Sequence, residues 1–401
     1  MKPMRIALLC WESRHSIAVG GLAEHITELA AGLHRRGHEV HLFTRMIPGQ
    51  PSCSRIDGVF YHRCPYEVHP DFLIDNARMC HSFVWHFAQA EHRLAAPFDV
   101  VHGHDWLAVR AMRQAKNRHH RPVVMTVHST EYGRCGNQLF EGESRRKREL
   151  ECEGTYLANR LICVSKTLRD EVRELYRVPA DKMDVVYNGV DVARFDQRAD
   201  ARSTRRAFAL SPADSVVLFA GRMTRQKGPD LLVEAIPQLV QRHPHARFVF
   251  AGDGDMRTGL AQRADELGIG GTTRFIGHRD GRDLVGLFKT ADLVCVPSRN
   301  EPFGIVILEA WSARKPVVTT RNGGPAEFVK HNTNGVTVRD HHEAIGAGVS
   351  TVLADKRNAR RMGLNGRREA EARFSWDVVA AATERVYQSV IQSSGTPDEL
   401  R

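Results

Sequence analysis

The residues with the clearest chemical potential are two acids, Glu301 and Glu309, in the segment EPFGIVILE of this 401-residue chain. We expect the segment to follow a strand over residues 293–297 and to enter a helix at Gly304, where the amides of Gly304 and Ile305 favour a phosphate group. With Glu309 about one helical turn beyond the loop, the two carboxylates cannot sit at the ~5 Å separation of a retaining glycosidase. They are better placed to hold two parts of one long ligand. A surface loop beside an exposed helical glutamate is the alternative.

Two cations, Arg222 and Lys227, lie in a second strand-end loop. The sequence GRMTRQKG follows an expected strand over residues 216–220. Cations in a loop bounded by glycines suit a diphosphate, because they stabilise the negative charge that grows on it as a leaving group. The loop lacks the G-x-x-x-x-G-K-[ST] pattern of a Walker A loop.

The N-terminal half contains two weaker candidates. Gly20 and Gly21 precede an expected helix over residues 22–36, where a phosphate could approach closely, although most glycine pairs are simple turns. His128 ends an expected strand over residues 123–127, and we expect its side chain to project toward an interdomain cleft.

The remaining motifs favour structure over metal or dinucleotide binding. In AGDGD at residues 251–255 the next glycine falls at position 259 instead of 257, so the G-x-G-x-x-G fingerprint fails. A Gly-rich turn explains these residues better than a metal-binding Asp-x-Asp. His102, His104 and Asp105 lack a further group of ligands, so we expect them to serve structure and hydrogen bonding, and we expect no metal site.

Short apolar runs alternate with longer helical patterns in two successive series. The first opens with strands over residues 5–10 and 39–44, and the second opens with strands over residues 216–220 and 247–251. This alternation predicts an α/β protein with two doubly wound, Rossmann-like parallel sheets.

A turn signal, NGVD at residues 188–191, and the polar stretch after it mark the domain boundary. We assign residues 1–190 to an N-terminal domain, 191–206 to a linker and 207–376 to a C-terminal domain. A last helix in residues 377–401 exceeds what the second sheet requires. We expect it to pack back on the N-terminal domain.

Composition narrows the function classes. The net charge of +10 suits nucleic acid, an anionic membrane or a phosphorylated substrate, but no nucleic-acid-binding motif occurs, so we expect no such partner. The longest apolar runs are far below the ~20 residues of a transmembrane helix, which leaves at most a weak peripheral membrane contact. A basic start without a cleavage site predicts no secretory signal and a cytoplasmic location. Eight cysteines without a C-x-x-C pair predict free thiols.

Together these motifs resemble the retaining nucleotide-sugar glycosyltransferases of the GT-B fold, family 4, over nearly the whole chain. The hallmark is the Glu-x₇-Glu pair of Glu301 and Glu309. Further matches are VGGL at 19–22, RGHEV at 36–40, VS at 164–165, NGVD at 188–191, the Arg222/Lys227 loop, GGPAE at 323–327 and FSW at 374–376.

The resemblance implies two Rossmann-like domains that face a cleft, the N-terminal one on the acceptor side and the C-terminal one binding the donor. It also implies a nucleotide diphosphate sugar as co-substrate, with no obligatory metal or other cofactor. Arg222 and Lys227 then neutralise the donor diphosphate. The amides at Gly304–Ile305 and the turn at Gly20–Gly21 assist them.

The remaining donor residues also receive roles from the resemblance. Glu309 accepts hydrogen bonds from the ribose, Glu301 contacts the transferred hexose, and His128 lies near the reacting face of the sugar. The backbone at Gly277–His278 meets the base, and Phe303 belongs to the donor-binding set. The implied catalytic set is His128, Glu301, Arg222 and Lys227.

The acceptor is suggested by HSTEYGR at residues 128–134, with GES at 142–144 and Glu153, which resemble the glycogen-synthase-like subset that builds α-1,4-glucans. Residues 20–22 also resemble the Lys-x-Gly-Gly-Leu motif of those synthases, with Ala18 at the lysine position. The implied activity is transfer of a hexose, glucose foremost, from UDP-glucose or ADP-glucose to a glucan or other carbohydrate. Other interpretations are a family 4 hexosyltransferase for a glycoconjugate, lipid-linked or small-molecule acceptor, a nucleotide-sugar epimerase, and a basic binding module without catalysis.

Overall fold

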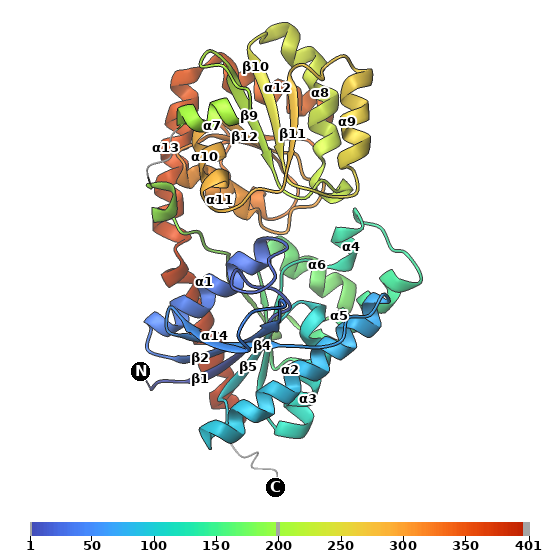
Figure 1. Ribbon diagram of the computed structural model, residues 1–401, viewed down its shortest axis with the longest axis vertical. Coiled ribbons are helices and arrows are strands. Elements are labelled where there is room, and N and C mark those ends of the chain that lie inside the picture. Colours follow the sequence, from blue (N-terminus) through green and yellow to red (C-terminus); the bar gives the residue numbers. More distant parts are fainter. Residues whose placement is uncertain (1, 198–200, 396–401) are drawn as a thin grey trace. The chain divides into compact units, whose positions relative to one another are not determined.

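The structure is a computed structural model that describes residues 2–197 and 201–395. The described chain forms two compact units, each a sheet flanked by helices (Figure 1). Unit 1 consists of the chain up to Tyr132, Leu139–Asn188 and the C-terminal stretch from Trp376. Unit 2 consists of Gly133–Gln138 and Gly189–Ser375.

Unit 1 is built on an eight-stranded sheet with the order β3-β4-β2-β1-β5-β6-β7-β8. Its strands are β1 (Arg5–Leu9), β2 (Glu39–Arg45), β3 (Cys53–Ile56), β4 (Val59–Cys64), β5 (Val100–His104), β6 (Val123–Val127), β7 (Arg160–Cys163) and β8 (Met183–Val185). Because β1 lies between β2 and β5, the chain winds outward in both directions and helices cover both faces. Neighbouring strands pair in parallel except β3 and β4.

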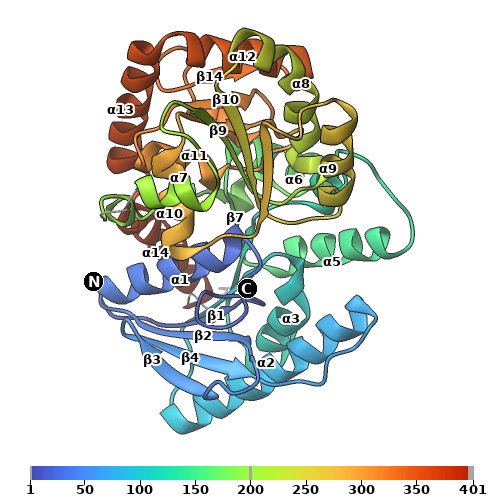
Figure 2. The ribbon, with the colours of Figure 1, turned by 45° about the horizontal axis from the view of Figure 1, so that its top comes forward.

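The antiparallel hairpin of β3 and β4 at the sheet edge is absent from the strands predicted above (Figure 2). Ile56 pairs with Val59 across Asp57 and Gly58, whose φ angles are 48° and 80°. Two positive φ angles are the requirement of a two-residue type I′ turn, for which Asp-Gly is a preferred sequence. This dipeptide is the signal by which the sequence could have predicted the hairpin.

The last helix of the chain belongs to unit 1. The helices there are α1 (Gly21–Arg35), α2 (Phe72–Leu94), α3 (Val109–His119), α5 (Glu143–Leu157), α6 (Lys166–Tyr176) and α14 (Trp376–Gly395), while α4 (Glu131–Arg134) spans the change to unit 2. α14 lies alongside α1 (Figure 1). Gly32 of α1 permits this approach, because a Cβ there would stand 3.0 Å from the Cβ of Ala380. Trp376 and Tyr387 of α14 are buried in the core of unit 1.

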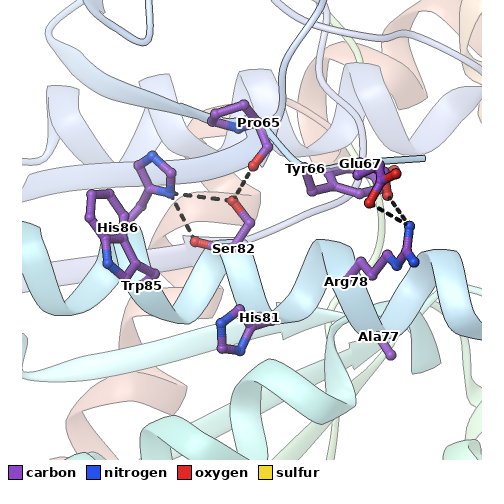
Figure 3. Close-up of a pocket in the computed structure, with 9 residues that line it drawn as sticks. All are labelled: Pro65, Tyr66, Glu67, Ala77, Arg78, His81, Ser82, Trp85 and His86. Carbon is purple, nitrogen blue, oxygen red and sulfur yellow. Dashed lines mark hydrogen bonds and ion pairs between the residues drawn. The ribbon is translucent and has the colours of Figure 1, made fainter. Parts of the chain in front are cut away.

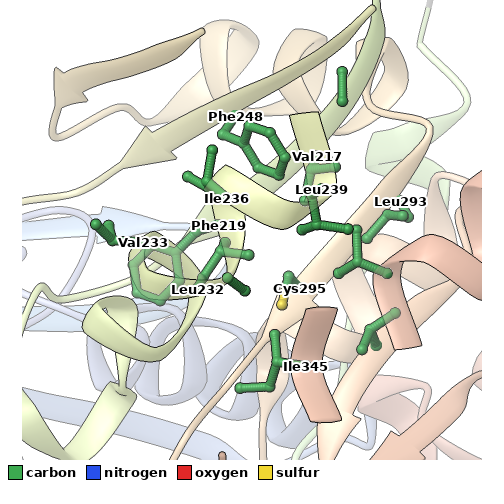
Figure 4. Close-up of a cluster of buried hydrophobic side chains, with 14 of the residues drawn as sticks. Val217, Phe219, Leu232, Val233, Ile236, Leu239, Phe248, Leu293, Cys295 and Ile345 are labelled. Atoms are coloured by element: carbon green, nitrogen blue, oxygen red, sulfur yellow. The ribbon is translucent and has the colours of Figure 1, made fainter. Parts of the chain in front are cut away.

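Unit 2 contains a six-stranded, wholly parallel sheet with the order β11-β10-β9-β12-β13-β14. Its strands are β9 (Ser215–Ala220), β10 (Ala246–Ala251), β11 (Thr273–Gly277), β12 (Leu293–Val296), β13 (Val317–Thr320) and β14 (Val336–Val338). Its helices are α7 (Ala201–Ala207), α8 (Pro229–Arg242), α9 (Arg257–Glu266), α10 (Gly281–Thr290), α11 (Ile305–Ser312), α12 (His342–Ala354) and α13 (Lys356–Arg373). The core between α8 and the sheet packs Ile236 and Leu239 against Phe248 and Cys295 (Figure 4). Two α/β domains with parallel sheets are thus confirmed, with β3 as the antiparallel exception.

The described residues of the predicted linker, 191–197 and 201–206, group with unit 2. They include the short 3₁₀ helix η3 (Ala193–Phe195) and most of α7. Phe195 is buried edge-to-face against Phe288 of α10, with ring centroids 5.7 Å apart, and Asp196 forms an ion pair with Arg367. A single aromatic anchor among charges carries no strand or helix period, which is why the sequence pattern did not predict this packing.

Two expectations from composition can be compared with the structure. All eight cysteines are free, which confirms the predicted thiols. None of the helices in the described part of the chain combines the length and the apolar character that crossing a bilayer requires.

A buried histidine pair in unit 1 gives a testable pH dependence. His41 Nδ1 and His62 Nε2 are 2.9 Å apart between β2 and β4, and burial lowers the pKa of both rings, that of His62 to about 3. The unfolded chain therefore binds more protons than the folded chain between pH 3 and about 6.5. The contribution of this pair to the free energy of unfolding is fully present above about pH 6.5 and is lost as the pH falls toward 3.

We expect His62→Gln to reduce the loss of unfolding free energy between pH 7 and pH 5 by up to about 2 kcal/mol. Urea unfolding at the two pH values measures this difference, whatever the absolute stability of the variant. The exposed His92→Gln serves as the control. An equal pH dependence in His62→Gln and the wild type would contradict the assignment.

Candidate active site

The loop from β9 to α8 in unit 2 carries the predicted diphosphate cations. Its last turn is the 3₁₀ helix η4 (Arg225–Lys227), which ends at Gly228 with a φ of 64°. A Cβ on Gly228 would lie 2.2 Å from the carbonyl oxygen of Pro297, at the end of the neighbouring β12. Glycine is required at position 228 for two reasons: the backbone is left-handed, and the two loops approach closely.

We expect Gly228→Ala to destabilise the chain by about 1–3 kcal/mol more than Gly268→Ala. Gly268 has a similar φ of 69°, but a Cβ there would meet nothing within 4 Å, so it shares the backbone strain without the clash. Urea unfolding of the two variants isolates the contact with Pro297. Equal losses of stability would mean that the two loops are not packed as described.

Lys227 and Glu301 form the central contact of the candidate site. The Lys227 Nζ lies 2.9 Å from both carboxylate oxygens of Glu301, and Ser298 Oγ donates to Glu301 Oε2 at 2.9 Å. Glu301 is only 4% exposed. The two residues follow β9 and β12, which are neighbours in the sheet, so their carboxyl ends bring the side chains together.

The backbone of Glu301 is held from a third loop. Its carbonyl oxygen accepts a 2.8 Å hydrogen bond from the amide of Gly324, and a Cβ on Gly323 would lie 2.1 Å from the same oxygen. The GGPAE motif at residues 323–327 therefore fixes Glu301 by close packing of backbones. This gives a physical reason for the motif that the sequence alone did not supply.

The start of α11 offers the amides that were expected to meet a phosphate. Gly304 is the N-cap residue, with a φ of 96° and no side-chain cap, and Ile305 opens the helix. The helix N-terminus therefore keeps its dipole and its first amides available to an anion. Glu309 lies one turn into α11 and is partly buried.

Arg222 is exposed, and its guanidinium contacts no hydrogen-bonding or charged partner among the residues that the structure describes.

A different arginine, Arg299, links the two loops of the site. It forms two hydrogen bonds with the carboxylate of Asp230, at 2.8 and 2.6 Å, and its amide donates to the carbonyl oxygen of Gln226. Sequence reasoning missed this ion pair, although an acid in the first turn of α8 and an arginine in the loop after β12 were a usable signal.

The Gly277–His278 backbone, assigned to the base, is engaged with the loop after β10. Gly277 O accepts from the amide of Gly252 at 2.9 Å, and the amide of His278 donates to Asp253 Oδ2 at 2.8 Å. That hydrogen bond, together with Arg257, lowers the pKa of Asp253. Asp253 thus braces two adjacent loops, which agrees with the Gly-rich turn predicted for its motif.

The side chain of Phe303 has a structural position. It is 2% exposed, and its ring lies 5.1 Å from that of Phe328 and 6.0 Å from that of Phe374. The ring of Phe303 therefore serves the packing of unit 2, and its place in the donor-binding set stays a prediction.

In unit 1, the glycine turn is held by an acid that sequence reasoning missed. Glu12 is 3% exposed, and its Oε2 accepts hydrogen bonds from the amides of Val19 and Gly20 at 2.5 and 3.0 Å. Gly20 is the N-cap residue of α1, and Gly21 is its first residue. Because Glu12 occupies the amide of Gly20, an anion at this turn would have to use the amides that follow.

His128 follows β6 and lies among other histidines. Its amide donates to Asp105 Oδ1 at 2.7 Å, and its Nε2 lies 3.0 Å from Nδ1 of His104. Burial lowers the pKa of His128 to about 3. His102 instead contacts Tyr387 Oη at 2.6 Å and Thr126 Oγ1 at 2.7 Å, consistent with the expected hydrogen-bonding role.

A separate hollow of about 620 Å³ lies between α2 and the loop that precedes it (Figure 3). Its lining residues are Pro65, Tyr66, Glu67, Ala77, Arg78, His81, Ser82, Trp85 and His86. None of the predicted site residues is among them. Gly20, Gly21 and His128 belong to unit 1, and the other predicted site residues belong to unit 2.

Comparison with known proteins shows the family to which the chain belongs. Residues 19–194 match the family described as Glycosyltransferase Family 4, and residues 200–369 match the one described as Glycosyl transferases group 1. An uncharacterised glycosyltransferase of Methanocaldococcus jannaschii is 36% identical over 98% of this chain and 100% of its own length. Glycogen synthase of Mycobacterium tuberculosis is 30% identical over 98% and 97%, and D-inositol 3-phosphate glycosyltransferase of Saccharomonospora viridis is 32% identical over 97% and 95%.

Solved structures agree on the fold. Sucrose-phosphate synthase of Thermosynechococcus elongatus superposes with a TM-score of 0.81 at 22% identity, covering 97% of this chain and 100% of the other. Anabaena HepE in complex with UDP and glucose gives 0.77 at 22% identity, covering 96% and 100%. The chain therefore belongs to the group 1, family 4 glycosyltransferases and has their GT-B fold.

Proposed function

We propose that this chain is a retaining hexosyltransferase that moves glucose from a nucleotide diphosphate glucose to the 4-hydroxyl of an α-1,4-glucan. The observation that carries the donor half is the contact of Lys227 with Glu301, with the exposed Arg222 in the same loop. This arrangement offers two cations to a diphosphate and one buried carboxylate to the hydroxyls of a hexose.

The charges of the site suit a departing diphosphate. Lys227 is neutralised in part by Glu301, so a donor shares its Nζ with that carboxylate, whereas Arg222 brings a cation that no described acid neutralises. The amides at the start of α11 add donors without adding charge. Groups fixed in place before the reaction stabilise the growing negative charge without reorganisation, which is the largest catalytic term in many enzymes.

In the proposed reaction the bond from the anomeric carbon to the donor phosphate oxygen breaks. A bond from the same carbon to the acceptor oxygen forms on the same face, and the acceptor proton passes to the departing phosphate oxygen. Glu301 is a poor candidate for a covalent nucleophile, because Lys227 and Ser298 already hydrogen-bond to its oxygens. Same-face attack in an ion-pair-like state therefore accounts for retention.

His128 acts in this proposal as a hydrogen-bond partner of the sugar. With a pKa of about 3, its imidazole is neutral at pH 7, so it is unsuited to donating a proton as an acid. Lys227 and Arg222 supply the positive charge, and we propose that no metal or other cofactor is required.

The acceptor rests on the relatives. Glycogen synthase at 30% identity over 98% of the chain supports a glucan. The D-inositol 3-phosphate glycosyltransferase at 32% supports a small phosphorylated acceptor as the second candidate, which also suits the net charge of +10. The same donor site serves both acceptors.

One experiment separates these acceptors. The chain is incubated with UDP-glucose or ADP-glucose, in EDTA, with either maltooligosaccharides or D-inositol 3-phosphate, and the products are analysed by mass spectrometry. We expect chain lengthening of the maltooligosaccharides with one of the two donors. Glucosylation of the inositol phosphate alone would replace the glucan with the second candidate, and sugar exchange without an acceptor would favour an epimerase.

A further inference from the structure

Three histidines of unit 1 meet at the carboxyl ends of its central strands. His25 lies on α1, His104 ends β5, and His128 follows β6, and one ring nitrogen from each lies within 4.8 Å of one from each of the others. We propose that this histidine triad binds a divalent transition metal of the Zn²⁺ class. The bound metal would withdraw His128 from the sugar and inhibit transfer, a consequence that rests on the proposed function.

The first ligand is His25, which is already oriented as a metal ligand would be. Its Nδ1 donates to Asn188 Oδ1 at 2.8 Å, which leaves the lone pair on Nε2. That Nε2 is buried and has no hydrogen-bond partner among the described residues. Metal-bound histidines commonly donate their second ring nitrogen to an oxygen in this way, which fixes the tautomer and the ring orientation.

The second ligand, His104, also has a buried ring nitrogen without a hydrogen-bond partner. The residue is fully buried, and its Nε2 also lacks a hydrogen-bond partner within the described chain. When His104 Nδ1 donates to His128 Nε2 at 3.0 Å, the unpaired Nε2 of His104 is a second buried lone pair. Binding of the metal breaks this hydrogen bond, and the freed lone pair of His128 Nε2 makes His128 the third ligand. Buried polar atoms are rarely left unpaired, and a cation would satisfy both lone pairs at once.

The spacing and the ligand type select the metal. Two nitrogens bound tetrahedrally at about 2.0–2.1 Å lie about 3.3 Å apart. The nitrogens of the triad lie within 4.8 Å of one another, so each pair has to close by at most about 1.5 Å on binding. Three imidazoles without a thiolate favour Zn²⁺, Cu²⁺ or Ni²⁺ over Mg²⁺ or Ca²⁺. A fourth position stays open to water or a ligand, as in three-histidine zinc sites.

A direct test uses Co²⁺ and Zn²⁺ as probes of the full-length chain after treatment with a chelator. We expect one Co²⁺ per chain with the visible absorption of a tetrahedral site, and displacement of that Co²⁺ by Zn²⁺. His25→Gln should weaken binding by at least about 100-fold, and Asn188→Ala, which keeps all three ligands, by about 10- to 100-fold. Circular dichroism verifies that each variant is folded.

A second group in the described chain, the exposed cluster of His341, His342 and Glu343, could also hold a metal and provides the matched control. The double variant H341Q/H342Q should keep the tight Co²⁺ site and its spectrum. The proposal is overturned if this double variant loses the site, if folded His25→Gln and Asn188→Ala bind as tightly as the wild type, or if the wild type takes up no stoichiometric Co²⁺.

The consequence for activity is tested separately. Stoichiometric Zn²⁺ should inhibit glucosyl transfer by the wild type and by H341Q/H342Q, and EDTA should restore it, whereas any residual activity of His25→Gln should resist Zn²⁺. Failure of transfer to every acceptor would refute the proposed function and leave the spectroscopic result standing. Metal uptake without inhibition would remove only the claimed effect on His128.

Discussion

Replacing Lys227 with alanine is expected to lower kcat by a factor of about 10²–10³. The Nζ of Lys227 is held 2.9 Å from both oxygens of Glu301, so it stands in place before any charge develops on a departing diphosphate. The substitution removes this cation and also leaves the charge of a carboxylate that is 4% exposed without its ion-pair partner. Arg222→Ala should have an effect of similar size, because it removes the second cation of the same loop.

The control for these variants is Arg242→Ala. Arg242 is an exposed cation at the far end of α8, the helix that begins directly after the loop, about 20 Å along its axis. Steady-state kinetics with a saturating donor should give wild-type kcat for Arg242→Ala. Turnover near the wild-type value in both Lys227→Ala and Arg222→Ala would refute the diphosphate assignment.

Glu301→Gln is expected to lower kcat by about 10²-fold while changing the KM for the donor far less. The amide keeps the size of the side chain but loses the negative charge that accepts hydrogen bonds from the hexose as positive charge grows at its anomeric carbon. Lys227 meanwhile becomes free to pair fully with the diphosphate, which sustains binding of the donor.

The control is Glu266→Gln on α9. Glu266 is exposed, and the one ion pair described for its carboxylate is a surface pair with Arg263. A rise in KM with unchanged kcat in Glu301→Gln would show that Glu301 binds the donor uniformly and takes no part in the chemistry. Thermal unfolding of both variants separates loss of function from loss of fold.

The sequence predicted the elements with strong apolar periods and missed those defined by single contacts. The central strands and α1 were predicted because buried parallel strands and amphipathic helices leave long patterns. β14 has three residues and leaves none. The β3–β4 hairpin depends on the Asp57–Gly58 turn, and the packing of residues 191–206 depends on the single anchor Phe195.

The site shows the same division. Neighbouring strands β9 and β12 bring Lys227 to Glu301, and strand-end reasoning predicted both loops. It could not predict that Phe303 turns its ring into an aromatic cluster, because an aromatic residue in a loop motif suits either a ligand or a core. Glu12 was missed because its role depends on how the intervening loop folds back over the amides of Val19 and Gly20.

The histidine triad illustrates contacts that sequence spacing conceals. In the sequence, His104 stands beside His102 and Asp105. In the structure its partners are His25 on α1 and His128, which follows β6. The parallel pairing of β5 with β6 brings His104 and His128 together, and α1 contributes His25.

The central claim, that the loops after β9 and β12 hold a nucleoside diphosphate through Lys227 and Arg222, is tested most directly by isothermal titration of UDP, ADP and GDP into the full chain. The account predicts that at least one of them binds with one-to-one stoichiometry, at least about tenfold more weakly to Lys227→Ala and to Arg222→Ala, and equally well to Arg242→Ala. Binding of equal strength to Lys227→Ala, Arg222→Ala and the wild type, or no binding of any of the three nucleotides to the wild type, would contradict it.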